Sequence, residues 1–128
     1  MRIEAEATIP RAGFSAEGKQ VGARRRRTAS ERLLEALADL AQGQARVVSH
    51  GEANWASITF AGTRHRIVLE FAGEAAVAAG ECFIAFLPEH EFTLPGHLVA
   101  DAAVVSVDHV AAPPLLRVTC ELLLLEEG

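Results

Sequence analysis

The C-terminal part of the chain, from Leu98 to Leu125, constrains the fold more than any other stretch. Two apolar arms flank a short loop at residues 111–114, where two prolines stand side by side. If the chain folds back at this loop, side chains of matching character face each other: Asp108–Arg117, Ser106–Thr119, Val107–Val118, Val105–Cys120 and Ala103–Leu122. Such pairs are favourable cross-strand neighbours, and a shift of one residue would lose them. The sequence therefore predicts an antiparallel pair of strands.

Residues 3–49 predict a strand, a helix and a second strand. Apolar and polar residues alternate over residues 3–9, which indicates a strand with one buried face. Thr28 and Glu31 have the spacing of a capping box, and an apolar stripe at helical spacing follows until Gly43. A strand is then expected over residues 45–49, with a turn around Gly51.

Residues 55–88 predict a hairpin and a second helix. Gly62-Thr63 is typical of a two-residue hairpin turn, which would place Trp55 opposite Glu70 and Phe60 opposite His65. Between residue 73 and the proline at 88 we predict one helix, in preference to a helix that ends at Gly80 and is followed by a strand.

The predicted order is strand, helix, strand, strand, helix, strand, with one extra strand paired to the last. This is the βαββαβ order of the ferredoxin-like split βαβ unit. We therefore predict an α+β two-layer sandwich in a single domain, residues 1–128, with both helices on one face of one antiparallel sheet. Residues 11–27 are expected to form a flexible, arginine-rich loop. Many unrelated proteins share this order, so it does not indicate a chemistry.

Charge, apolar stretches and cysteine content narrow the class of protein that we expect. The net charge is −5, but residues 19–32 carry +5, which leaves −10 elsewhere. No apolar stretch has the pattern of a secretory signal or the length of a membrane span. Cys82 and Cys120 lie far apart and are expected to be reduced thiols. Arginine-rich and alanine-rich usage is typical of a GC-rich bacterial genome, so we expect a cytoplasmic bacterial protein.

An arginine run before the first helix is the clearest candidate for a binding site. The anion-binding candidates are Arg24, Arg25, Arg26, Arg27 and Thr28. Guanidinium groups beside the free amides of a helix N-terminus can bind a phosphate, a nucleic-acid backbone or an acidic partner. The run has no interleaved aromatic residues for base stacking. We therefore favour a solvated segment and do not expect nucleic-acid binding.

The histidines supply a second candidate. His65 is expected on the inward face of its hairpin, and the pocket candidates are His65, Arg64, Arg66 and His109. A histidine that closes the edge of the core is the simpler interpretation, and we favour it. The five histidines are scattered along the sequence without the spacing of a metal-binding helix, so we expect no metal and no cofactor. Nucleotide-binding and serine-hydrolase motifs are absent from the sequence, and we expect no enzymatic activity.

The apolar pattern of the last strand favours self-association. Leu122 to Leu125 do not alternate with polar residues, and such strands are normally buried on both faces. In the register above, the sheet face without helices would carry Leu98, Ala102, Val104, Leu115, Leu123 and Leu125. We therefore predict a non-enzymatic binding or assembly module that forms a homodimer through this face, unless residues 11–27 cover it. The alternatives are a small ligand-binding protein or enzyme with a pocket between sheet and helices, and an anion or nucleic-acid binder.

Overall fold

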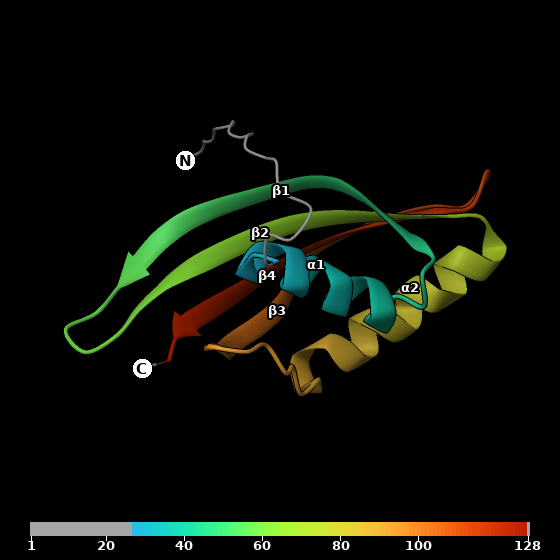
Figure 1. Ribbon diagram of the computed structural model, residues 1–128. Helices are drawn as coiled ribbons and strands as arrows, with labels where there is room; N and C mark the ends of the chain where they lie inside the picture. The colour runs from blue at the N-terminus through green and yellow to red at the C-terminus, as the bar shows by residue number, and fades with distance from the viewer. Residues whose placement is uncertain (1–26, 128) are drawn as a thin grey trace, which may run out of the picture.

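The computed structural model describes residues 27–127, which form two layers, a pair of helices and one four-stranded sheet (Figure 1). The elements are α1 (Ala29–Leu40), β1 (Ala45–Ala56), β2 (Ala61–Ala72), α2 (Glu74–Phe86), a short 3₁₀ helix (Leu87–Glu89), β3 (His97–Val110) and β4 (Leu115–Glu126). All neighbouring strands are antiparallel, in the order β1-β2-β4-β3. Figure 1 shows both helices on the same side of the sheet. The predicted α+β two-layer class is confirmed. The strand predicted at residues 3–9 and most of the predicted loop 11–27 lie outside the described residues.

The described chain consists of two αββ units in succession, and the second strands of the two units, β2 and β4, pair at the centre of the sheet. The strand predicted as an extra C-terminal one is therefore central. Its four consecutive leucines, Leu122 to Leu125, are all buried, with exposed fractions between 0% and 9%. The run thus belongs to a strand that is buried on both faces within one chain.

Local sequence signals determine the two ends of α1. The Thr28 hydroxyl accepts a hydrogen bond from the backbone N–H of Glu31 (3.1 Å), and the Glu31 carboxylate accepts one from the backbone N–H of Thr28 (2.9 Å). This is the predicted capping box. Leu33 and Leu37 then bury the apolar face of the helix. The helix ends at Leu40, and the chain then turns through two residues of positive φ, Gln42 at 59° and Gly43 at 69°. The predicted stop at Gly43 therefore lies in the terminating turn, but the first left-handed residue is Gln42.

The second helix is a single element, as predicted, and it packs on β2 and β4. Phe83 is fully buried, and its ring lies 5.9 Å from the ring of Phe71 on β2, centroid to centroid. Gly80 brings the helix backbone against the sheet. A Cβ atom there would lie 2.8 Å from Cγ of Phe71 and 2.7 Å from a methyl group of Leu116. The glycine therefore permits close packing between helix and sheet.

The predicted turn at Gly62-Thr63 is wrong. The β1–β2 turn spans residues 57–60, where the Ser57 N–H donates to the Phe60 carbonyl (2.8 Å) and the Phe60 N–H donates to the Ser57 hydroxyl (3.1 Å). Strand β1 is continuous past Gly51, and Gly62 lies inside β2. A Cβ atom at Gly62 would lie only 2.1 Å from the carbonyl oxygen of Leu124 on β4. This glycine permits the close approach of two strands, and it does not form a turn.

The register of the C-terminal pair is confirmed near its loop and wrong farther away. The pairs Asp108–Arg117, Val107–Val118 and Ser106–Thr119 occur as predicted. A bulge between Val104 and Ser106 then shifts β3 by one residue, so that Val104 pairs with Cys120 and Ala102 with Leu122. Val104 and Ala102 consequently pack against the core under the helices and do not belong to the open face, where they were predicted.

Candidate functional site

The residues predicted to bind an anion are only partly within the described chain. Arg27 is exposed and donates a hydrogen bond to the carboxylate of Glu35 in the second turn of α1. Thr28 uses its hydroxyl to cap the helix. Arg24 to Arg26 lie outside the described residues.

The residues predicted to line a pocket lie on different faces of the sheet. His65 points from β2 toward the helices, with 2% of its surface exposed. Side chains alternate along a strand, so Arg64 and Arg66 lie on the open face, where Arg66 forms an ion pair with Glu121. His109 is exposed near the loop end of β3, opposite Leu116. The structure does not bring these four residues together. A hollow of about 200 Å³ lies elsewhere, between α1 and the segment before β3, lined by Arg32, Asp39 and Leu94 among others.

A cluster of three side chains, His50, Glu52 and His65, occupies the space between the sheet and the first turn of α1. We call it the histidine cluster. His50 and Glu52 are alternate residues of β1, and His65 is the cross-strand partner of Glu52 on β2. All three therefore project from the same face. Nε2 of His50 lies 2.9 Å from Nδ1 of His65 and 3.9 Å from a carboxylate oxygen of Glu52.

The helix above the cluster holds its carboxylate in place. The Ser30 hydroxyl in the first turn of α1 donates a hydrogen bond of 2.8 Å to the same Glu52 oxygen. The two imidazole rings lie 5.1 Å apart between centroids and are inclined by 30°. The ligand atoms of all three residues are within 4.8 Å of one another.

Burial keeps both imidazoles neutral near pH 7. It lowers the pKa of His65 to about 4, although the negative charge of Glu52 acts in the opposite direction. It lowers the pKa of His50 as well, again against the effect of Glu52. Two neutral rings share one hydrogen bond, in which one nitrogen donates and the other accepts, and each ring keeps its remaining nitrogen for another partner.

Sequence reasoning missed this cluster because the predicted turn was misplaced. With a turn at Gly62-Thr63, His65 faces Phe60; with the observed turn at residues 57–60, it faces Glu52. The premise that the histidines are scattered is therefore wrong for His50 and His65. The available signal was the His50-x-Glu52 spacing, which places two ligand-type side chains on one face of a strand.

The open face of the sheet carries charged side chains from all four strands. In one row, Glu70 on β2 accepts hydrogen bonds from Arg46 on β1 and from Arg117 on β4. These two guanidinium groups hold the pKa of Glu70 below its ordinary value, and the hydrogen bond from Arg117 has the larger effect. Asp108 on β3 completes the row as the partner of Arg117.

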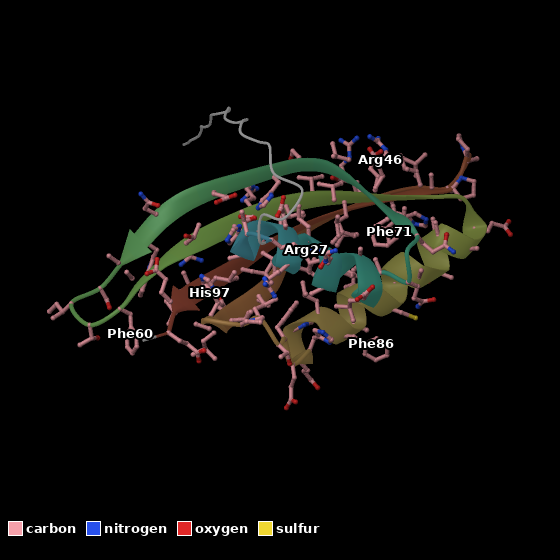
Figure 2. The ribbon with its side chains drawn as sticks, in the orientation of Figure 1. Arg27, Arg46, Phe60, Phe71, Phe86 and His97 are labelled. Atoms are coloured by element: carbon pink, nitrogen blue, oxygen red, sulfur yellow. The ribbon has the colours of Figure 1, made fainter. Side chains whose placement is uncertain are left out.

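One end of the sheet is apolar. A row on the open face there consists of Trp55, Gly62, Leu125 and Leu98, one from each strand. Leu98 is 51% exposed. Just beyond it, the β1–β2 turn presents Ile58 and Phe60, which are also exposed. Figure 2 shows Phe60 at this tip, whereas Phe86 lies away from it on α2, on the helix side of the molecule.

Comparisons with known proteins find only distant structural similarity. No family model matches the chain, and no curated protein does. A chain from the virion of a native gene transfer agent particle is similar, with a TM-score of 0.47 and 18% identity over 78% of this chain and 92% of that one. The type 4 fimbrial biogenesis protein PilO from Pseudomonas aeruginosa has a TM-score of 0.37 and 14% identity; the match covers 70% of this chain and 63% of PilO. Within the described residues, neither helix has the length and apolar character needed to cross a membrane.

Proposed function

We propose that the protein is a non-enzymatic assembly module that forms a homodimer through the open face of its sheet. The observation that carries this proposal is the charge pattern of that face. In the described part of the chain, the charged residues of this face are four arginines and four carboxylates: Arg46, Arg64, Arg66, Arg117, Glu70, Glu121, Asp101 and Asp108. They sum to zero on a chain whose net charge is −5. Two copies can therefore bring this face together without net repulsion, although the chains as a whole repel each other.

The pattern is also self-complementary about one particular twofold axis. An axis parallel to the strands, between β2 and β4, places β1 of one copy over β3 of the other. Arg46 then lies over Asp108 of the partner subunit, because both belong to the same row of the sheet. At the apolar end, Trp55 lies over Leu98 of the partner subunit for the same reason. Symmetry repeats each contact twice, which makes the interface isologous.

Exposed aliphatic residues on β3 support the same face. Leu98 and Val110 lie on this face and are 51% and 48% exposed, although they belong to a sheet. Packed sheets lie about 10 Å apart, so a partner sheet would remove much of this apolar surface from water. Leu123 and Leu125 contribute less than the sequence indicated, because they are already buried within the chain.

Light scattering with size-exclusion chromatography tests the proposal. We expect a mass of about twice 13.7 kDa at micromolar concentration, and a mass of 13.7 kDa would rule the homodimer out. Leu98→Lys should shift the protein toward the monomer. The matched control is Phe86→Lys, because Phe86 is 60% exposed on the helix side and should leave the mass unchanged.

Charge reversal tests the orientation of the two copies. Asp108→Arg should weaken the dimer by placing like charges together, and adding Arg46→Asp should restore it. A dimer that is insensitive to both substitutions would contradict the axis proposed here, and a dimer weakened equally by Phe86→Lys would contradict the choice of face.

A further inference from the structure

We propose that His50, Glu52 and His65 form a binding site for one transition-metal dication, with Zn²⁺ as the best match to its chemistry. This site lies under α1, on the side of the sheet opposite the proposed dimer face, so it does not depend on the proposed function. Two imidazoles and one carboxylate are ligands that zinc accepts in protein sites with three protein ligands and one open position.

The distances between the ligand atoms fit such an ion after small side-chain rotations. Bonds of about 2.0–2.1 Å to a tetrahedral ion place two ligand atoms about 3.4 Å apart. The nitrogens of His50 and His65 are 2.9 Å apart, and the His50 nitrogen and the Glu52 oxygen are 3.9 Å apart. An ion therefore requires the first pair to open and the second to close, each by roughly half an ångström. The third pair, His65 and Glu52, whose ligand atoms lie within 4.8 Å of each other, must adopt the same separation. The backbone pairing of β1 and β2 already holds all three side chains on one face.

The two imidazoles offer suitable nitrogen ligands. Nε2 of His50 and Nδ1 of His65 face each other, and zinc binds a histidine through a ring nitrogen that carries no proton. Each ring can carry its single proton on the nitrogen that faces away from the ion. Glu52 supplies the negative charge that two neutral imidazoles lack.

The surroundings orient one ligand and leave access for solvent. Ser30 holds Glu52 by its hydrogen bond of 2.8 Å, which is the kind of outer contact that positions a metal ligand. His65 is buried, whereas the Glu52 side chain is 48% exposed. The open coordination position therefore faces the Glu52 side, where a water molecule or an exchangeable ligand can reach the ion.

Titration of the full-length protein with metal alone tests the proposal. After treatment with EDTA, calorimetry with ZnCl₂ should give one ion per chain, and Co²⁺ should give the visible absorption of a tetrahedral site. His50→Gln and Glu52→Gln should each weaken binding at least tenfold. Ser30→Ala should weaken it by about tenfold, which a serine with a purely structural role would not do.

Substitutions at His50 and Glu52 can test the site without unfolding the protein. Because His65 is fully buried, His65→Ala risks unfolding, so the test relies on the less buried His50 and Glu52. The matched control is His109→Gln, an exposed histidine on β3, which should bind Zn²⁺ like the wild type. Absence of Zn²⁺ binding at micromolar concentration would overturn the proposal. Binding that is unchanged in His50→Gln, or lost in His109→Gln, would also overturn it.

Discussion

Replacement of Gly80 by alanine sets helix propensity against packing. In the interior of a helix, alanine is more favourable than glycine by about 1 kcal/mol, so propensity alone predicts stabilisation. The new Cβ atom, however, would lie 2.8 and 2.9 Å from two ring atoms of Phe71 and 2.7 Å from a methyl group of Leu116. Carbon atoms in favourable contact are about 3.5–4.0 Å apart, so both neighbours would have to move.

The buried position of Phe71 makes that movement costly. The Leu116 methyl group can rotate away, but the Phe71 ring is fully buried and is packed against Phe83. Overpacking of this kind typically costs about 1–3 kcal/mol. After subtraction of the propensity gain, we expect Gly80→Ala to lower the free energy of unfolding by about 1 kcal/mol.

Urea denaturation followed by circular dichroism measures this difference. The matched control is Ala78→Gly in the same helix, at an exposed position, where only propensity changes and a loss of about 1 kcal/mol is expected. Both variants should therefore be less stable than the wild type. If Gly80→Ala is more stable while Ala78→Gly is less stable, propensity dominates, and the argument from close packing is refuted.

Three further predictions concern titration, thiol reactivity and the arginine run. Burial lowers the pKa of His65 from 6.5 to about 4, so between these pH values only the unfolded chain binds this proton. Metal-free protein should therefore lose about 3 kcal/mol of stability as the pH falls from 6.5 to 4. An NMR titration that gives this ring an ordinary pKa would contradict the prediction. Cys82 is exposed, whereas burial raises the pKa of Cys120 to about 12, so a thiol reagent should label one cysteine in the native protein and both in urea. Replacing Arg24–Arg27 by serine should change stability by less than about 0.5 kcal/mol, and a larger drop in the thermal midpoint would show that the run is packed against the fold.

Signals that act within a few residues were read correctly from the sequence. The capping box at Thr28 depends on neighbouring backbone groups, so the start of α1 followed from local sequence. Gly43 indicated the turn that ends the helix, but the first residue of positive φ in that turn is Gln42. The pairing of Asp108 with Arg117 was predictable because the short loop between the arms fixes the register close to it.

Features that depend on contacts between strands far apart in the sequence could not be predicted from local patterns. Gly62 resembles a turn residue in the sequence, but it is required because β4 approaches β2 there, at Leu124, which is 62 residues away in the chain. With the turn misplaced, the predicted register of the hairpin did not pair His65 with Glu52, so the sequence did not predict the histidine cluster. The two register shifts in β3 could not be predicted either, since no glycine or proline in residues 97–110 marks them.

The bulges also have a consequence for colloidal behaviour. Among the strands of residues 27–127, β1 and β3 are the outer two, and each lacks a neighbouring strand on one side, which is the usual starting point for uncontrolled growth of a sheet from molecule to molecule. The register of β1 shifts between Val47 and Ser49, and that of β3 shifts twice, so neither outer strand is a regular template for another chain. Stacking of molecules strand by strand into fibrils is therefore disfavoured, even though the chain is rich in valine and leucine.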